Sequence, residues 1–511
     1  MRPDSLTLAQ LNNLLGGTIL GGADPSMEIQ SVVSSGDHAE PNSIFVAYRG
    51  VVVDGHDFIG AAFENGSVAA VVTEDAMLGD RPGILVENSH RALSRLCAAF
   101  AGDPSRDLLT IGITGTNGKT TIHWLLYHAL DRLGLPAIRI GSLGIAAEGQ
   151  IERSGKVTTR GAGRIVLTTP AACEIHDSLR LAVDKGLKAC VLETSSHALD
   201  QHRVDNVWYD AAVFTNLTTD HLDYHPDMES YFQTKITLFR QLADQRTETG
   251  AEKGGAVINS DCPYGTRLVG IAGEMGLPVL TFGTDETAAV RILEFDQHFD
   301  RSTLKLGFSG EEHEIATALI GDYNASNMAA AFAALISLGF GPQESASALS
   351  GIPSVPGRLE SVGSRDIAVL VDYAHTGEGL RNLLLALRGF VGNELWVVFG
   401  CGGGKDPRKR AGMGEAAKDL ADRIVLTSDN PKNEDPAKIV EDILSSGCEP
   451  EFIELDRGLA IEQTLRMARK GDVVVLVGKG HEDYQIIGNQ TSYFSDREEA
   501  IKWRERGLLD R

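Results

Sequence analysis

One segment, residues 112–121, constrains the fold of this chain more than any other, and its sequence is GITGTNGKTT. An apolar run at residues 108–113 predicts a buried strand before the turn, and an apolar-periodic run from Ile122 predicts a helix after it. A strand, a glycine-rich turn and a helix are typical of a phosphate-binding loop, where backbone N–H groups, Lys119 and the Thr120 hydroxyl serve a polyphosphate and its Mg²⁺. Ile113 replaces the first glycine of the strict pattern, so a plain connecting turn is the alternative. The positions of Lys119 and Thr120 favour the phosphate loop.

The chain has 511 residues, which is too long for one core, and we expect three α/β domains at residues 1–106, 107–355 and 356–511. The first is predicted to be a small α/β domain. In the second, apolar runs alternate with helical segments, which predicts a parallel sheet with helices on both faces. Together with the phosphate-loop pattern, this sheet is expected to form an ATPase domain of the phosphate-loop type. The third repeats this alternation, with a helical pattern at 379–387, and is expected to be doubly wound and Rossmann-like. The expected strands are 109–113, 189–192, 211–214 and 256–258 in the second domain, and 367–371, 395–399, 424–426 and 473–477 in the third.

Composition excludes several classes of protein. The net charge of −23 argues against a general binder of nucleic acid or membrane surfaces. No apolar run approaches the ~20 residues of a membrane helix, and residues 1–10 lack the pattern of a signal peptide. Six scattered cysteines without a C-x-x-C pair suggest reduced thiols. We therefore expect a cytoplasmic protein.

Two polar segments follow predicted strands. Glu193 stands just past the strand at 189–192, where a nucleotide-binding sheet holds its metal carboxylate, although an ordinary strand-end acid is the alternative. The segment 220–225, DHLDYH, holds two histidines and two aspartates. A transition-metal site is one interpretation. Because Mg²⁺ needs few protein ligands and no cysteine is near, we favour Mg²⁺ with His221 as the one imidazole ligand.

These motifs and several later ones together resemble the Mur ligase family over nearly the whole chain. The matching segments are GTNGKTT at 115–121, ETSSHALDQHR at 193–203, NLTTDHLDYH at 216–225, Lys235, GDYNASN at 321–327, PGRLE at 356–360 and DYAH at 372–375. Within the family, SSHALDQHR, the DNP at 429–431 and the GKGHE at 478–482 are similar to the ligases that add the third amino acid.

The resemblance implies an ATP-dependent amide ligase of peptidoglycan precursor synthesis, acting on UDP-MurNAc-L-Ala-D-Glu, ATP and a diamino acid, and we expect a monomer. A substrate carboxylate would attack the γ-phosphate, and the amino acid would then attack the acyl phosphate. Lys119, Glu193, His221 and Lys235 would be catalytic, with Mg²⁺ on Thr120, Glu193, His221 and carbamylated Lys235. By its sequence pattern alone Lys235 is a solvated helix lysine; the resemblance reverses that reading.

The resemblance also implies binding residues for nucleotide and donor. ATP would contact Gly115, Thr116, Asn117, Gly118, Lys119, Thr120, Thr121, Asn324, Arg358 and Asp372, with Asp372 on the ribose. The UDP-linked dipeptide would contact Thr168, Thr169, Ser195, Gln201 and Arg203. Since Arg358 lies at a domain junction, we expect domain closure to carry it to the phosphates. Where the family usually has Asp-Ser-Arg for uridine, this chain has Ser-Gly-Asp at 35–37.

The amino-acid site is implied at Lys405, Asp429, Asn430, Lys432, Gly478 and Glu482. Ligases that add meso-diaminopimelate usually have arginines where this chain has Lys405 and Lys432, and lysine keeps the charge but loses the fork. Lys432 would attract the distal carboxylate of diaminopimelate and repel the distal ammonium of L-lysine, so we favour diaminopimelate. An exposed turn lysine is the alternative for Lys432.

Other functions remain open at this point. L-Lysine or another diamino acid could be the acceptor, and a divergent paralogue of a specialised pathway would explain the altered residues. Folylpolyglutamate synthetase shares the loop and central sheet, but it lacks the first domain and the DNP and GHE segments. A non-catalytic nucleotide-binding regulator would be expected to lose catalytic residues that this chain retains.

Overall fold

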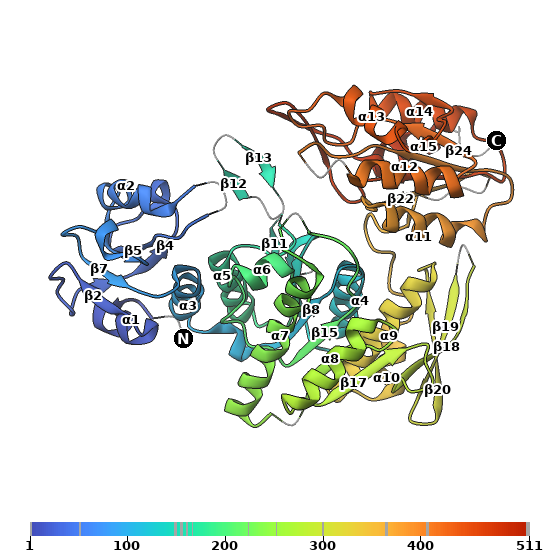
Figure 1. Ribbon diagram of the computed structural model, residues 1–511. Helices are drawn as coiled ribbons and strands as arrows, with labels where there is room; N and C mark the ends of the chain where they lie inside the picture. Colours follow the sequence, from blue (N-terminus) through green and yellow to red (C-terminus); the bar gives the residue numbers. More distant parts are fainter. Residues whose placement is uncertain are drawn as a thin grey trace.

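The computed structural model describes residues 3–50, 53–147, 151–153, 157–159, 162–165, 167–222, 224–251, 253–298, 301–362, 366–404 and 408–506. Figure 1 shows three bodies in chain order, with the central one between the N-terminal and C-terminal ones. Each body contains a sheet whose interior strands are parallel. The predicted three-domain α/β architecture is therefore confirmed.

The central sheet has 11 strands, of which the middle ones run parallel and both edges are antiparallel. Its order is β11 (Ile151–Arg153), β10 (Gly144–Ala147), β9 (Ala137–Gly141), β14 (Ala189–Glu193), β8 (Leu109–Thr114), β15 (Ala211–Phe214), β16 (Gly255–Asn259), β17 (Val279–Gly283), β18 (Val290–Asp296), β19 (Ser302–Phe308) and β20 (Glu311–Thr317). The predicted strands at 109–113, 189–192, 211–214 and 256–258 are confirmed. The antiparallel extension β18–β20 was not predicted.

Alternate residues of the parallel strands face two helical layers, because successive side chains of a strand point to opposite faces. Ile111 and Val191 pack with α4 (Lys119–Arg132), α9 (Asp322–Ser337) and α10 (Pro342–Leu349). Cys190 and Leu192 pack with α5 (Ala172–Asp184), α7 (Met228–Thr249) and α8 (Pro263–Glu274). A short helix, α6 (Ser196–Asp200), follows β14, and β12 (Val157–Thr159) pairs with β13 (Ala162–Ile165).

The two outer domains have smaller sheets. The N-terminal sheet is β2 (Thr18–Leu20), β7 (Gly83–Leu85), β6 (Ser67–Val72), β5 (Ser43–Val46) and β4 (Ser31–Val33). Around it lie β1 (Leu6–Thr7), β3 (Glu28–Ile29), α1 (Leu8–Leu15), α2 (Ile59–Glu64), α3 (Ser89–Phe100) and the 3₁₀ turns η1 (Gly36–His38), η2 (Gly55–Phe58), η3 (Asp75–Met77) and η4 (Pro104–Asp107). The C-terminal sheet is β21 (Glu360–Ser361), β22 (Ala368–Asp372), β26 (Val473–Val477), β23 (Leu395–Phe399), β24 (Arg423–Leu426) and β25 (Phe452–Ile453).

Helices cover both faces of the C-terminal sheet, which confirms the doubly wound prediction. The helices α11 (Gly377–Arg388), α12 (Arg408–Leu420) and α13 (Pro436–Leu444) lie on one face, and α14 (Arg457–Met467) and α15 (Asp496–Glu505) lie on the other. A hairpin, β27 (Tyr484–Ile487) and β28 (Gln490–Tyr493), stands apart from the sheet. The helix predicted at 379–387 begins earlier, at Gly377, because the Thr376 hydroxyl caps it by accepting from Gly379 N at 3.1 Å.

The expectation of reduced thiols is wrong for one pair. Cys97 of α3 and Cys173 of α5 form a disulfide, with a Cα–Cα distance of 4.9 Å, between the N-terminal and central domains. The packing of α3 on α5 brings these two residues together, and their spacing of 76 residues along the chain gives no sign of it. Cys190, Cys262, Cys401 and Cys448 are free and buried.

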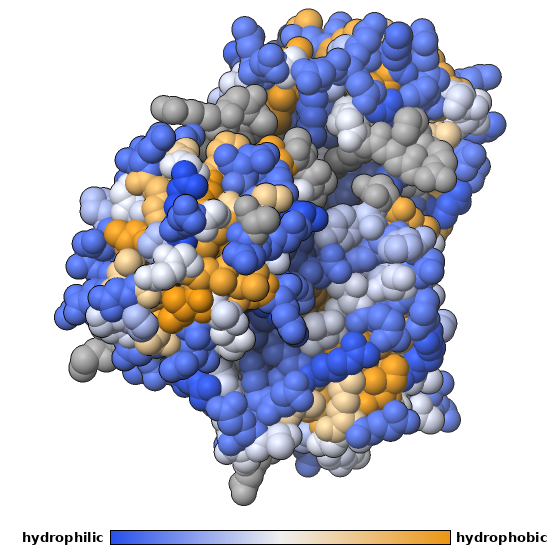
Figure 2. All heavy atoms as spheres, turned by 60° about the vertical axis from the view of Figure 1, so that its left-hand side comes forward, coloured by the Kyte–Doolittle hydropathy of each residue, from blue (hydrophilic) through white to orange (hydrophobic). Residues whose placement is uncertain are grey.

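No helix in the described part of the chain combines the length and the apolar character needed to cross a bilayer. Figure 2 shows separate apolar patches among mostly hydrophilic residues on one face of the molecule.

A buried ion pair joins α14 to α15 in the C-terminal domain, and its removal tests the fold. Arg457 at the start of α14 donates from Nε and Nη2 to both oxygens of Asp496 at 2.6 Å, and both side chains are fully buried. Asp496→Ala would leave the guanidinium buried without its partner, so we expect unfolding to become easier by about 3–5 kcal/mol. Urea denaturation measures this change.

The matched control for this prediction is Glu462→Ala, which breaks the half-exposed pair of Glu462 with Arg466 on the same helix α14. Exposed pairs contribute less than about 1 kcal/mol. Equal losses in the two variants would contradict a structural role for the buried pair.

Candidate active site

The predicted strand–turn–helix at residues 112–121 is confirmed. Gly115 and Gly118 have φ of +146° and +88°, and a Cβ would collide with Thr215 Oγ1 at the first and with Asn327 Oδ1 at the second. Only glycine fits such positions without strain. Thr116 N and Asn117 N donate to Asn216 at 3.0 and 2.9 Å, which fixes the loop on the segment after β15. The helix α4 then starts at Lys119, with Thr120 and Thr121 buried in its first turn.

Glu193 lies at the carboxyl end of β14, beside the loop, and its side chain is fully buried. Its carboxylate accepts from Thr120 Oγ1 at 3.0 Å and from Ser142 N and Oγ at 2.9 and 3.2 Å. Burial raises the pKa of Glu193, while the charge of Lys119 and these hydrogen bonds act to lower it. The carboxylate and the Thr120 hydroxyl thus form one oxygen cluster.

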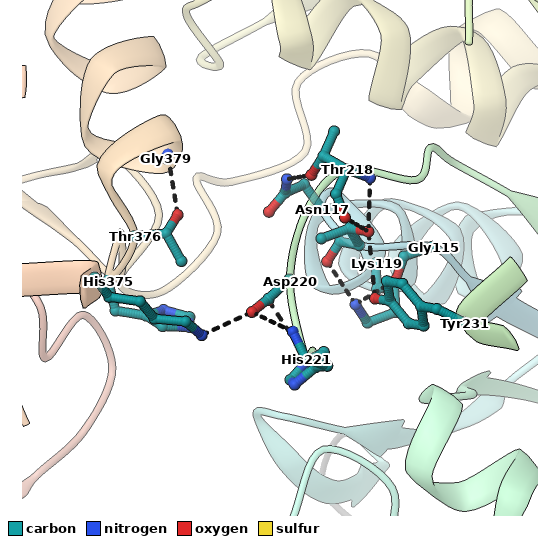
Figure 3. A network of polar contacts seen from close by, with 12 residues as sticks. Gly115, Asn117, Lys119, Thr218, Asp220, His221, Tyr231, His375, Thr376 and Gly379 are labelled. Atoms are coloured by element: carbon teal, nitrogen blue, oxygen red, sulfur yellow. Dashed lines mark hydrogen bonds and ion pairs between the residues drawn. The ribbon is translucent and has the colours of Figure 1, made fainter. Parts of the chain in front are cut away.

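Two lysines meet at the backbone of the loop. Lys119 Nζ donates to Gly115 O and Thr116 O, both at 2.8 Å, and Lys235 Nζ of α7 donates to Gly115 O at 2.9 Å. Figure 3 shows Lys119 and Tyr231 beside Gly115, and the ring centre of Tyr231 is 4.5 Å from Lys235 Nζ. Burial lowers the pKa of both lysines, that of Lys235 well below its usual value, and the charge of Lys119 adds to the effect on Lys235. Lys235 is therefore a buried amine and not a solvated helix lysine.

The loop after β15 carries Asp220 and His221 toward the C-terminal domain (Figure 3). Burial acts to raise the pKa of Asp220, but His221 and Lys409 outweigh it and hold the pKa below its usual value. Lys409 of α12 reaches Asp220 Oδ1 at 2.8 Å. Burial lowers the pKa of His221 to about 4, so its imidazole is neutral at pH 7 and has a nitrogen lone pair for a metal.

These side chains fit a magnesium ion that is also held by phosphate. No group of three or more His, Cys, Asp or Glu side chains in the described residues could hold a metal, and Asp223 lies outside them. Mg²⁺ keeps several waters and binds through one or two carboxylates plus substrate phosphates. The oxygens of Glu193 and Thr120, 3.0 Å apart beside the loop, suit such an ion.

Four of the five predicted donor residues form one hydrogen-bonded cluster next to Glu193. Thr169 Oγ1 donates to Glu193 O at 2.7 Å and accepts from Ser195 N at 3.0 Å, and Arg203 donates to Thr169 O at 2.9 Å. Gln201 accepts from the guanidinium of Arg203. Thr168 lies half-buried in the same turn. The structure therefore brings together residues from the turn before α5 and from the segment after β14.

The predicted ATP residues of the later segments lie at the junction with the C-terminal domain. The guanidinium of Arg358 lies 4.7 Å from the ring centre of Tyr373, and its charge acts on the pKa of both Lys119 and Glu193. Asp372 ends β22, and its carboxylate accepts from Leu359 N and Ala374 N at 2.8 and 2.7 Å. Asn324, at the start of α9, donates to Ile320 O at 2.8 Å and accepts from Asn327 at 2.9 Å.

Four of the predicted amino-acid residues lie together at the carboxyl ends of β24 and β26. Asn430 donates to Glu482 at 2.9 Å, and buried Lys479 lies 3.1 Å from Asn430 Oδ1 and 3.4 Å from Asp429. Gly478 has φ of +117°, with its Cβ position 3.4 Å from Asp429 Oδ2. Burial raises the pKa of Glu482, and the charge of Asp429 adds to this. Two carboxylates with one lysine leave a net negative cluster.

The other two predicted amino-acid residues stand apart from this cluster. Lys432 is exposed, with φ of +53°, and its backbone pairs with Ile486 and Gly488 of the hairpin. Lys405 lies outside the described residues. In the N-terminal domain, the segment 35–37 runs from β4 into η1, where Gly36 O accepts from Asn65 at 2.9 Å.

Sequence reasoning missed several residues of the site. Ser142 holds Glu193 from the turn between β9 and β10, Lys409 holds Asp220, and Lys479 pairs with Asp429. Lys479 lies inside the GKGHE segment, so its place in a motif was a usable signal. Ser142 and Lys409 carry no local signal, because their partners are brought near only by the fold.

Comparison with known proteins identifies the family. Residues 28–101 match the Mur ligase family catalytic domain, residues 113–335 the Mur ligase middle domain, and residues 357–480 the Mur ligase glutamate ligase domain. The UDP-N-acetylmuramoyl-L-alanyl-D-glutamate–2,6-diaminopimelate ligase of Thermosynechococcus vestitus is 40% identical over 486 residues, covering 93% of each chain. The enzyme of the same name from Gloeobacter violaceus is 40% identical over 510 residues, covering 98% of this chain and 99% of the relative.

A solved structure of a UDP-N-acetylmuramoyl-L-alanyl-D-glutamate–2,6-diaminopimelate ligase superposes with a TM-score of 0.69. Its sequence is 28% identical, and the match covers 98% of this chain and 99% of that one. The family matches, the near-complete coverage by relatives at 40% identity and the shared fold agree with one another. The chain belongs to the Mur ligase family.

Proposed function

We propose that this protein is an ATP-dependent ligase that joins a diamino acid, meso-diaminopimelate, to UDP-MurNAc-L-Ala-D-Glu in peptidoglycan precursor synthesis. One arrangement carries the proposal. Lys119 and Lys235 both donate to the phosphate-loop carbonyl of Gly115, and the Thr120 hydroxyl donates to the carboxylate of Glu193. The names of the relatives at 40% identity support the choice of donor and acceptor.

The reaction proceeds through an acyl phosphate. An oxygen of the D-glutamyl carboxylate attacks the γ-phosphorus of ATP, and the bond to the ADP oxygen breaks. The amine of the diamino acid attacks the acyl carbon, the bond to phosphate breaks, and the amine loses a proton. Phosphoryl transfer mainly needs position and charge neutralisation. Lys119 and the loop N–H groups supply both, and Arg358 adds positive charge from the C-terminal side.

Lys235 acts as a carbamate in this proposal. Carbamylation needs an uncharged amine, and burial together with Lys119 lowers the pKa of Lys235 well below its usual value. Addition of CO₂ to this amine forms an N–C bond and releases one proton, which leaves an anionic carbamate beside Gly115, close to Lys119. Thr120, Glu193, His221 and this carbamate would hold Mg²⁺, which supplies charge neutralisation to the phosphates when bound.

The other binding residues are assigned to the donor, the nucleotide and the acceptor. Thr168, Thr169, Ser195, Gln201 and Arg203 hold the UDP-linked dipeptide, and Asn324, Arg358 and Asp372 serve ATP. Asp429, Asn430, Gly478 and Glu482 receive the amino acid, whose distal ammonium suits their net negative cluster. Lys432 and Lys405 attract the distal carboxylate of diaminopimelate.

We propose three domains at residues 1–106, 107–355 and 356–511, for donor, ATP and amino acid respectively. The central family match, 113–335, and the C-terminal match, 357–480, fall within the last two. We propose a cytoplasmic location, since ATP and the UDP-linked donor are cytoplasmic molecules. We also propose that the protein is a monomer.

Phosphate release tests the proposed function. With Mg·ATP and UDP-MurNAc-L-Ala-D-Glu, we expect meso-diaminopimelate to stimulate release strongly, and L-lysine or no amino acid to give little. Stimulation by L-lysine alone would assign the other acceptor. Stimulation by neither would favour a divergent paralogue.

Lys432 is the residue on which this choice of acceptor depends. Lys432→Glu would repel the distal carboxylate, so we expect kcat/KM for meso-diaminopimelate to fall by about 10- to 100-fold, since like-charge contacts cost several kcal/mol at most. Lys438→Glu, at an exposed position of α13 nearby in sequence, is the control for a general charge effect. Equal losses in both variants would mean that Lys432 does not contact the acceptor.

Lys235→Ala tests the carbamate. Loss of a preorganised charged group of this kind typically costs about 10²- to 10³-fold in kcat. We expect partial rescue by acetate or formate, whose carboxylate can enter the space that the side chain leaves. Lys253→Ala, an exposed lysine beyond the end of α7, is the control. Full activity of Lys235→Ala without added acid would refute the carbamate role.

A further inference from the structure

The turn 480–482 lies between the proposed amino-acid site and the metal carboxylate. Glu482 accepts from Asn430 at 2.9 Å inside the amino-acid cluster. The preceding residue, His481, points the other way and donates from Nε2 to Ser142 O of the central domain at 3.1 Å. Adjacent residues of one short turn therefore contact the proposed amino-acid cluster on one side and the residue that holds Glu193 on the other.

The contact at Ser142 leads directly to Glu193. The N–H of Ser142 donates to Glu193 Oε1 at 2.9 Å and its hydroxyl to Oε2 at 3.2 Å, so this residue holds both carboxylate oxygens. A Cβ at Gly141 would collide with the same carboxylate, which shows how closely the turn packs against it. A shift of Ser142 must therefore move Glu193 or break its hydrogen bonds.

The same turn also packs on the junction between the two domains. Gly357 has φ of +66°, and a Cβ there would overlap the backbone of Gly480 and His481. The ring of Tyr373 lies 5.2 Å from that of His481 and 4.7 Å from the guanidinium of Arg358. The positions of the turn and of Arg358 therefore depend on each other, because both pack on the ring of Tyr373.

A second polar contact joins the C-terminal domain to the other candidate ligand segment. Lys409 at the start of α12 pairs with Asp220 at 2.8 Å, and the backbone N–H of His221 donates to the same Asp220 at 2.8 Å. The C-terminal domain therefore reaches both candidate metal ligands through one intermediate residue, Glu193 through Ser142 and His221 through Asp220.

We infer that His481 is a positioning residue that couples the amino-acid site to the Mg·ATP site, with the Lys409–Asp220 pair as a second connection. This inference rests on the proposed function and adds a regulation of it. An amino acid that orders Glu482 fixes the 480–482 turn, His481 then fixes Ser142, and Ser142 fixes Glu193. Binding of either ligand therefore tightens binding of the other, because such coupling is reciprocal.

Calorimetric titration of the full chain with Mg·AMPPNP, a non-hydrolysable ATP analogue, tests the coupling. UDP-MurNAc-L-Ala-D-Glu is present throughout, with and without meso-diaminopimelate. In the wild type we expect the amino acid to tighten nucleotide binding by about tenfold, within the usual range of such couplings. The coupling is the ratio of the AMPPNP Kd without the amino acid to the Kd with it. In His481→Ala we expect this ratio to fall toward one. In His481→Gln we expect the amide N–H donor to restore much of it.

Lys409 is tested through the metal. For Lys409→Ala we expect the Mg²⁺-dependent part of AMPPNP affinity, measured against EDTA, to fall about tenfold, the lower end of the range measured for metal-site positioning residues. Lys418→Ala, an exposed lysine on the same helix α12, is the matched control and should match the wild type. Thermal midpoints of all variants check that they fold.

The outcomes separate the inference from the proposed function. A wild-type ratio near one, in a protein that releases phosphate with diaminopimelate, would overturn the coupling alone. An unchanged ratio in folded His481→Ala would do the same. Absence of amino-acid-dependent phosphate release in the wild type would overturn the proposed function and the coupling with it.

Discussion

The buried carboxylate of Glu193 is the constraint around which the centre of this protein is organised. A carboxylate taken out of water is costly unless hydrogen bonds and a positive charge compensate it. Here the compensation comes from Thr120, Ser142 and the charge of Lys119. These residues stand at the carboxyl ends of β8, β9 and β14, which are neighbours in the sheet, so the parallel order itself brings them together.

The charges around the phosphate loop are balanced across domains. Lys119 and Lys235 both donate to Gly115 O, and the charge of Lys119 adds to burial in lowering the pKa of Lys235. Asp220 lies near both, yet its carboxylate is also paired with Lys409 of the C-terminal domain. The charge balance of the centre therefore includes a residue of the C-terminal domain, and the charge of Lys119 favours an uncharged Lys235 amine.

The sequence predicted those strands and turns whose structure depends on residues close together along the chain. Apolar runs such as 211–214 and 473–477 became strands with the same bounds, because a short run of buried β-branched and aliphatic residues in this alternation has few other solutions. The glycine spacing at 115 and 118 predicted the loop. Contacts between distant segments were not predictable in this way: the bond from His481 to Ser142 spans 339 residues, and the Cys97–Cys173 disulfide contradicted the expectation from cysteine spacing.

The two domain junctions differ in physical character, and this difference bears on function. At the first, α3 packs on α5, Cys97 is bonded to Cys173, and Asn206 donates to Ser94 at 3.2 Å, so covalent and packed contacts fix the N-terminal domain. At the second, Ile320 packs on the C-terminal core, the pairs His481–Ser142 and Lys409–Asp220 are polar, and the chain crosses at Gly357 with a positive φ. Polar contacts of this kind exchange with water at little net cost. A ligase must admit a new amino acid in each turnover while it keeps its activated donor from water. If the N-terminal domain holds the donor and the C-terminal domain the acceptor, as proposed, these two junctions meet both needs, because only the acceptor side has to open.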